Sequence, residues 1–119
     1  MIDLHIHTNY SDGHNSVQEI LSIAEKNKLT AISITDHNTV LAYDILKKIN
    51  FKDYYSGKIL SGIEMHCSFD DMVIELLGYG IAIDKIKKEL QKINYPNILE
   101  NIYKMQFKML MTTIKKIRH

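Results

Sequence analysis

The first part of the chain alternates between two hydrophobic periods, and this alternation restricts the fold more than any other feature of the sequence. Ile2, Leu4 and Ile6 stand at every second position with polar residues between them, which is the period of a β-strand. Ser16 and Glu19 then form the Ser-x-x-Glu pattern of a capping box, and apolar residues follow at the spacing of an α-helix. A strand followed by a helix is therefore expected at the start of the chain.

The same order recurs along the rest of the sequence. The later elements are expected to be strands over residues 31–35, 59–66 and 72–79, helices over 39–49 and 84–93, and a last helix that begins at Pro96. This order predicts an α/β fold with a mostly parallel sheet covered by helices. The third and fourth strands lie so close in sequence that we expect an antiparallel hairpin or a tight turn. No Pro-, Gly- or Ser-rich linker occurs, so residues 1–119 are expected to form one domain, with 96–119 as its C-terminal helix.

The balance of charge excludes two classes of protein. The 119 residues carry 15 Lys and Arg against 14 Asp and Glu, so the chain is neither a generally basic nucleic-acid binder nor a strongly acidic protein. A hydrophobic content of 45% argues against disorder. Cys67 is the only cysteine, and the sequence shows neither a secretory signal nor a stretch apolar enough to span a bilayer. These features predict a cytoplasmic protein without membrane contact.

Two histidines on the first strand are the first candidates for chemistry. His5 and His7 are two residues apart, so they point to the same face, about 6.5–7 Å apart along the strand. Two imidazoles at this separation can reach one metal ion. Taken alone, the pair is equally compatible with a surface or packing role.

Further polar residues follow the ends of the first three strands. They are Asp12, Asp36, His37 and Glu64. Because the carboxyl ends of parallel strands meet in one crevice, we expect these side chains to converge with the two histidines. Helix capping would explain either aspartate singly, but it does not explain His37 and Glu64. Nitrogen and carboxylate ligands of this kind suit zinc, manganese or iron.

The fourth strand and the end of the third add two more candidate ligands. Glu75 stands between Val73 and Leu77 on one face of the fourth strand. A carboxylate buried there would need a metal ion, a base or a route to water; alternatively, this face of the strand is open to solvent. His66 shares a side with Glu64 and is the weaker candidate, because it falls at the end of the expected strand.

A series of motifs stands in the order and spacing of a known family. They are His5-x-His7, Tyr10-Ser11-Asp12-Gly13, Ile34-Thr35-Asp36-His37-Asn38-Thr39, Gly62-Ile63-Glu64 and Leu76-Leu77-Gly78-Tyr79-Gly80. Together they resemble the first motifs of the polymerase and histidinol phosphatase (PHP) family. The resemblance implies a distorted seven-stranded β/α barrel that holds two or three divalent ions and hydrolyses phosphoesters.

The resemblance also implies a role for each matching residue. His5 and His7 would bind a first metal ion, Glu64 would bridge the first and second, and Asp12 and His37 would bind a third. The reaction implied is hydrolysis by metal-activated water, with zinc, manganese or iron as the ion. The substrate implied is a small, nucleotide-like phosphate compound.

Residues beside these ligands receive supporting roles from the same resemblance. Asp36 would order the surrounding loop, and Asn38 or Thr39 would cap the next helix. Glu75 stands where many family members have a histidine. A carboxylate at this position would shift the preference of the site toward harder ions such as manganese.

The chain is roughly half as long as the resemblance implies, and the late family motifs have no counterpart in it. The expected fold is therefore the N-terminal part of the barrel: three to four strands, covering helices and the long C-terminal helix. Open sheet edges invite pairing with another chain. The expected partner is a second copy or a missing C-terminal half, bound through the open edge and the C-terminal helix, although the apolar stripe of that helix also fits packing within the chain.

Two alternatives to a metal-dependent phosphoesterase follow from these features. One is a catalytically incomplete PHP module that acts through a partner chain. The other is a nucleic-acid accessory protein that uses the basic side of the last helix, formed by Lys104, Lys108, Lys115, Lys116, Arg118 and His119. Hydrolysis that needs Glu64 would favour the enzyme, whereas salt-sensitive nucleic-acid binding would favour the accessory role.

Overall fold

The computed structural model describes residues 1–92, except for the side chain of Phe69. In chain order its elements are β1 (Ile2–Ile6), α1 (Val17–Lys26), β2 (Ala31–Ile34), α2 (Leu41–Lys48), the 3-10 helix η1 (Phe51–Asp53), β3 (Lys58–Ile59), β4 (Gly62–Phe69), β5 (Met72–Tyr79) and α3 (Ile83–Lys92). The helix expected over 96–119 lies outside the described residues. The single domain expected over 1–119 stays a prediction for the same reason.

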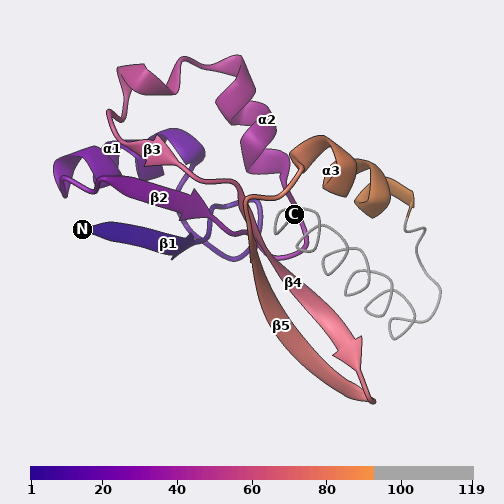
Figure 1. Cartoon of the computed structure of the whole chain (residues 1–119). Helices are drawn as coiled ribbons and strands as arrows, with labels where there is room; N and C mark the ends of the chain where they lie inside the picture. Colours follow the sequence, from indigo (N-terminus) through magenta and orange to yellow (C-terminus); the bar gives the residue numbers. More distant parts are fainter. Residues whose placement is uncertain (93–119) are drawn as a thin grey trace.

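A small parallel sheet with strand order β1-β2-β3 forms the centre of the fold, and α1 and α2 lie along it (Figure 1). Ile32 and Ile34 of β2 are fully buried, and they belong to one apolar cluster with Val17 and Leu21 of α1. β2 is hydrophobic because it lies between two other strands and beneath helices. The α/β fold and the mostly parallel sheet predicted from the sequence are confirmed.

The predicted capping box begins α1. The Ser16 hydroxyl accepts a hydrogen bond from the Glu19 backbone N–H at 3.2 Å, and the Glu19 carboxylate accepts one from the Ser16 N–H at 3.1 Å. These contacts satisfy two donors that the first turn of a helix leaves unpaired. The start of α1 is therefore fixed directly after the loop that follows β1.

The third strand differs from its prediction, because the structure divides it in two. β3 pairs with β2, but β4 begins at Gly62 and leaves the parallel sheet to pair with β5. At the break, the Tyr43 hydroxyl of α2 accepts a hydrogen bond from the Gly62 N–H at 2.8 Å and donates one to the Ile34 carbonyl at 2.7 Å. Gly62 also lies so close to Ser33 and Thr35 that any side chain there would overlap with theirs.

β4 and β5 form the antiparallel hairpin that their spacing predicted, and Figure 1 shows the hairpin extending away from the parallel sheet. Asp70 and Asp71 form its two-residue turn with φ of 47° and 62°. Positive φ at both central positions is the type I′ geometry, which matches the right-handed twist of paired strands. Val73 is 65% exposed and Glu75 is also exposed, so the reading of Glu75 as a buried carboxylate is wrong and the solvent-open face is correct.

Two ion pairs join α3 to α2 and so place the base of the hairpin against the rest of the fold. Lys87 Nζ lies 2.7 Å from an Asp44 carboxylate oxygen, and Lys47 Nζ lies 2.8 Å from Asp84. Ile86 of α3 is fully buried in the common apolar cluster. Apolar burial provides most of the packing here, because exposed ion pairs contribute little by themselves.

Replacing Tyr43 by Phe tests the junction between the sheet and the hairpin. The substitution keeps the buried ring but leaves the Gly62 N–H and the Ile34 carbonyl without the hydroxyl. We expect the free energy of unfolding to fall by about 1–3 kcal/mol in urea denaturation, because both groups are buried. Tyr54→Phe is the matched control, since Tyr54 is 39% exposed. Equal effects of the two substitutions would contradict the role given to Tyr43.

The pH dependence of the same pair of proteins gives a second prediction. Burial raises the pKa of Tyr43 from 10.0 to about 12. Above pH 10 the unfolded chain therefore releases a proton that the folded chain keeps, and Tyr43 lowers stability by about 1.4 kcal/mol per pH unit. The stability difference between wild type and Tyr43→Phe is expected to stay constant below pH 10 and to shrink as the pH rises toward 12. A constant difference across this range, measured by urea unfolding, would contradict the raised pKa.

Candidate metal centre

One oxygen of Glu64 is the point on which three imidazoles converge. Glu64 Oε1 lies 2.8 Å from His7 Nε2, 3.1 Å from His5 Nε2 and 3.5 Å from His37 Nε2. His5 and His7 reach it from the same face of β1, as the two-residue period predicted. Only 7% of the Glu64 side chain is exposed, so this oxygen has little contact with solvent.

Backbone pairing brings Glu64 to the histidine from the neighbouring strand. The Glu64 N–H donates to the Asp36 carbonyl at 3.1 Å, and the Asn38 N–H donates to the Glu64 carbonyl at 3.0 Å. The first residues of β4 therefore run parallel to the segment that follows β2, with His37 directly beside Glu64. The convergence expected at the carboxyl ends of the strands is thus produced by main-chain hydrogen bonds.

A second cluster extends from His7 toward solvent. His7 Nδ1 lies 2.6 Å from Asp12 Oδ1, and His37 Nε2 lies 3.3 Å from Asp12 Oδ2. The loop that carries Asp12 folds back onto β1, because the Ser11 and Gly13 N–H groups both donate to the Thr8 carbonyl. A side chain on Gly13 would overlap with the His7 carbonyl. Asp12 is 64% exposed and forms the open rim of the cluster.

A third cluster lies midway along the hairpin. His66 Nε2 is 2.7 Å from Glu75 Oε1, and the His66 ring stacks on His37 with ring centroids 4.8 Å apart. Ligand atoms of His37, His66 and Glu75 all lie within 4.8 Å of one another. The structure therefore brings the residues expected as metal ligands, except Asp36, to one edge in three clusters that share His7 and His37.

The donor atoms of the first two clusters fit a divalent ion. Zinc ligands lie about 2.0–2.2 Å from the ion, so ligand atoms around one ion stand about 3–3.5 Å apart. The Nε2 atoms of His5 and His37 lie 3.1 and 3.5 Å from Glu64 Oε1, and that of His7 is slightly closer at 2.8 Å. His37 Nδ1 is buried and has no hydrogen-bond partner among the described residues. The chemistry of the set, imidazole nitrogen with carboxylate oxygen, suits zinc, manganese or iron.

The electrostatics of the centre keep both carboxylates charged. Burial by itself raises the pKa of Glu64, but the hydrogen bonds from His5 and His7 and the charges of His37 and His5 outweigh burial and lower the pKa. For Asp12 burial likewise acts in the raising direction, while the hydrogen bond and charge of His7 and the charge of His37 lower the pKa. A carboxylate must be ionised to bind a metal ion, so this balance favours ion binding.

Comparison with known proteins places this geometry in a family. Residues 3–117 match the PHP domain. The chain belongs to the PHP family. An amidohydrolase from Chromobacterium violaceum, solved with bound sulfate and no metal, is similar in structure with a TM-score of 0.65 and 24% sequence identity. A protein named "putative metal-dependent phosphoesterase" from Bifidobacterium adolescentis is similar with a TM-score of 0.65 and 23% identity.

These likenesses extend over part of each relative. The matches cover 77% and 76% of this chain but 32% of each of the two solved chains, so the PHP chain spans about a third of their length. At this identity they establish the shared fold. No curated protein matches the sequence. Within residues 1–92, none of the helices has the length and apolar composition of a bilayer span.

Asp36 lies next to the PHP centre but outside all three clusters. Its side chain is 1% exposed and accepts hydrogen bonds from the Thr8 N–H, the Thr8 hydroxyl and the Ser11 hydroxyl at 2.6–2.7 Å. Asp36 therefore fastens the loop that carries Asp12, as expected for an ordering group. Thr8 was not singled out from the sequence, and Ser11 was named only as part of the Tyr10-Ser11-Asp12-Gly13 motif, although both stand inside the short polar segment after β1.

The role expected of Asn38 as a helix cap is not what the structure shows. Val40 is the N-cap of α2 and no side chain caps the helix, so neither Asn38 nor Thr39 has the expected role; the Thr39 hydroxyl accepts a hydrogen bond from the Leu41 N–H at 3.2 Å. Asn38 instead turns to β4, where its side-chain oxygen Oδ1 accepts a hydrogen bond from the His66 backbone N–H at 3.0 Å. Asn38 has φ of 53°, a left-handed conformation that asparagine tolerates better than most residues.

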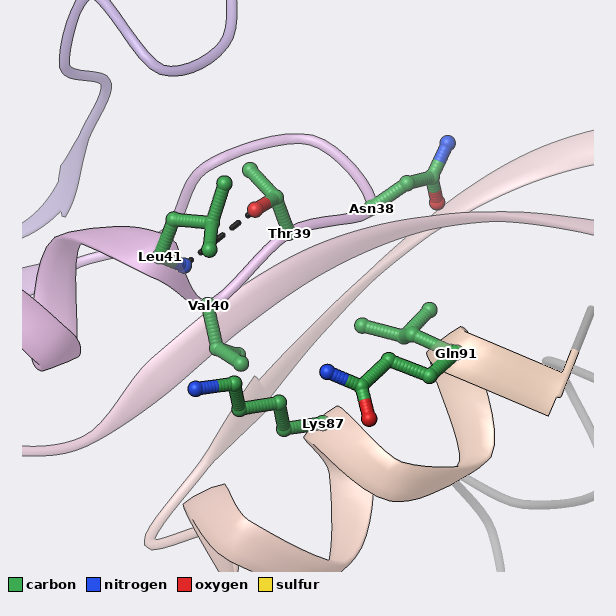
Figure 2. Close-up of a pocket in the computed structure, with 7 residues that line it drawn as sticks. Asn38, Thr39, Val40, Leu41, Lys87 and Gln91 are labelled. Atoms are coloured by element: carbon green, nitrogen blue, oxygen red, sulfur yellow. Dashed lines mark hydrogen bonds between the residues drawn. The ribbon is translucent and has the colours of Figure 1, made fainter.

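A pocket of about 170 Å³ lies between the start of α2 and α3, beside the centre (Figure 2). Figure 2 shows Lys87 and Gln91 of α3 facing Val40, with Asn38 at the far side of the group. None of the expected metal ligands lines this pocket. Lys87 is already paired with Asp44, so the pocket offers no unpaired cation from that residue.

Replacing Asp36 by Ala tests whether the centre depends on this loop anchor. The substitution leaves the buried Thr8 N–H and two hydroxyl groups without their acceptor, so we expect unfolding in urea to require about 1–3 kcal/mol less free energy. Asp53→Ala, at an exposed position, is the control and should change stability by less than about 0.5 kcal/mol. A small effect at Asp36 would mean that the loop is held by its backbone hydrogen bonds alone.

Proposed function

We propose that this PHP chain is a metal-dependent phosphoesterase that hydrolyses a phosphomonoester or nucleotide phosphate with a metal-activated water. The observation that carries the proposal is the convergence of three imidazole nitrogens on one buried carboxylate oxygen, within 3.5 Å. Such an arrangement has little use in a purely structural core, because it places several polar rings against a desolvated charge. Membership of the PHP family supports the same reading.

The residues proposed to hold two to three divalent ions divide by cluster. His5, His7 and Glu64 form the inner set, whereas Asp12 and His37 form the outer set with the second nitrogen of His7. Glu75 is a further candidate on the hairpin. A bound ion would lower the pKa of a water molecule, orient the phosphate and stabilise the leaving oxygen. The chain itself holds the donor atoms in place and shields Glu64 from solvent.

The position of Asp12 supports a phosphorylated substrate that approaches from solvent. Its carboxylate is 64% exposed, while Glu64 on the opposite side of His7 is almost fully covered. The outer set is therefore reachable by a small molecule through Asp12, and in the inner set Glu64 is shielded whereas the side chain of His5 is 51% exposed. We propose a small, nucleotide-like phosphate compound as the substrate class.

We also propose that a second polypeptide segment completes the site, either from another copy of the chain or from a C-terminal half. β1 is an edge of the described three-stranded sheet, and an open edge can pair with a further strand. Exposed apolar residues on the hairpin, Met72 and Val73, give a second surface for such a contact. Analytical ultracentrifugation of the purified chain, with and without manganese, tests the self-association form of this proposal.

Phosphate release tests the proposed activity. The purified chain is assayed with manganese on an aryl phosphate and a nucleoside bisphosphate, beside the same chain in chelator and the Glu64→Gln variant. We expect release that requires the metal and that falls at least about 100-fold in the variant, because even residues that only support metal ligands cost 10–100-fold when removed. Glu89→Gln on α3 is the matched control and should retain activity.

Other outcomes separate the alternatives. Release that is equal in wild type and Glu64→Gln, or unchanged by chelator, would contradict the proposal. Metal binding without release, rescued by a co-expressed C-terminal half of a family member, would identify an incomplete module. Salt-sensitive binding of nucleic acid that is indifferent to changes at His5 and His37 would identify an accessory protein.

A further inference from the structure

We infer that Asn38 holds His66 in the Nε2–H tautomer, so that His66 positions the Glu75 carboxylate and does not itself bind a metal ion. This assigns the hairpin's metal-facing donor to Glu75 and makes His66 and Asn38 positioning residues. The metal part of the inference rests on the proposed function, whereas the tautomer can be measured independently of any activity.

The orientation of the Asn38 amide follows from its two contacts with His66. Its Oδ1 lies 3.0 Å from the His66 backbone nitrogen, which can only donate. The other end of the amide, Nδ2, lies 3.3 Å from His66 Nδ1. Reversing the amide would place its NH₂ group against the backbone N–H, donor against donor. The backbone contact therefore fixes which end of the amide faces the ring.

The amide in turn determines which ring nitrogen carries the proton. Asn38 Nδ2 brings hydrogens toward His66 Nδ1, so Nδ1 must act as the acceptor. A neutral imidazole with an acceptor at Nδ1 carries its single proton on Nε2. That proton points at Glu75 Oε1, which lies 2.7 Å away and can only accept while it is ionised. In this series of hydrogen bonds, from the His66 backbone N–H through Asn38 and the His66 ring to Glu75, every donor then faces an acceptor.

This arrangement opposes direct coordination by His66. A neutral histidine that binds an ion through Nε2 must carry its proton on Nδ1, where it would meet the hydrogens of Asn38 Nδ2. The closeness of His66 to His37 and Glu75 is therefore explained by support of the carboxylate, since carboxylates that bind metals are commonly held by hydrogen bonds from neighbouring groups.

The hairpin register makes the support specific to this pair. His66 and Glu75 stand directly opposite each other in the β4–β5 ladder, and the two-residue turn at Asp70 and Asp71 fixes that register. A shift by one residue would turn one of the two side chains to the other face of the hairpin. Asn38 is fixed independently, because its own N–H donates to the Glu64 carbonyl.

The test uses the ¹⁵N-labelled full chain and long-range ¹H–¹⁵N correlation spectra of the histidine rings. Spectra are recorded at about pH 8, above the ordinary histidine range, with His66 assigned from a His66→Gln variant. We expect the pattern of the Nε2–H tautomer for His66. On titration with Zn²⁺ alone, the ring nitrogens of His5, His7 and His37 should shift, and His66 should keep its tautomer.

Asn38→Asp is the decisive variant, because it keeps the acceptor for the His66 N–H and replaces the NH₂ group by an acceptor. We expect His66 to gain a proton on Nδ1, seen as loss of the Nε2–H tautomer pattern, because a carboxylate then faces each of its ring nitrogens. Asn50→Asp, at an exposed position, should leave the His66 spectrum unchanged. In a competition assay with a Zn²⁺ chelator, His66→Ala should weaken Zn²⁺ binding by about 10–100-fold, as expected for a residue that supports a ligand.

Two results would overturn the inference: an Nδ1–H tautomer of His66 in the wild type, or a Zn²⁺-induced change at its Nε2 in the wild type. Both are independent of hydrolysis. If phosphate release requires metal while His66 has the Nδ1–H form, the proposed function stands and the inference fails. If His66 has the Nε2–H form and no phosphate is released, the tautomer assignment stands and the proposed function fails.

Discussion

Two backbone hydrogen bonds join Glu64 to the residues that follow β2, and the rest of the centre depends on them. They connect the Glu64 N–H to the Asp36 carbonyl and the Asn38 N–H to the Glu64 carbonyl. Because both bonds join main-chain atoms, they fix the position of the Glu64 backbone independently of the side-chain contacts. The same pairing orients His37 toward the carboxylate, buries Asp36 behind it and directs Asn38 to β4.

The surroundings of this pairing explain why a buried carboxylate is stable there. A charge removed from water is costly unless hydrogen bonds and opposite charges surround it. Glu64 receives these from imidazoles on β1 and after β2, while Asp36 receives three donors from the loop after β1. The two carboxylates thus have separate duties: one faces the donor cluster, and the other fastens the loop that closes it.

Much of this arrangement could be predicted from the sequence, because it follows from short-range rules. The period of β1 puts His5 and His7 on one face, and the position of His37 after a buried strand puts it at the same edge. The antiparallel hairpin was one of the two arrangements that spacing alone predicted, whereas its type I′ turn was not predicted. What short-range rules could not give was the break before Gly62, since it depends on the Tyr43 hydroxyl of a distant helix.

Asn38 and Glu75 are two further examples of what short-range sequence rules could not predict. Asn38 precedes a helix, which made a capping role the natural expectation, but its partner lies 28 residues further along the chain. Glu75 sits in an apolar run that suggested burial, yet its strand belongs to a hairpin that extends from the sheet and exposes that face. In both cases the decisive contact joins two elements, and local sequence patterns do not predict how those elements lie relative to each other.

His7 contacts carboxylates through both of its ring nitrogens, Asp12 through Nδ1 and Glu64 through Nε2. A neutral imidazole has only one N–H, so both contacts can be hydrogen bonds only when the ring is doubly protonated. Protons and divalent ions therefore compete for the same nitrogens, and ion binding at either cluster must release protons from the centre. Metal binding proposed for this PHP domain would consequently depend on pH, with protons acting as competitors of the metal ion.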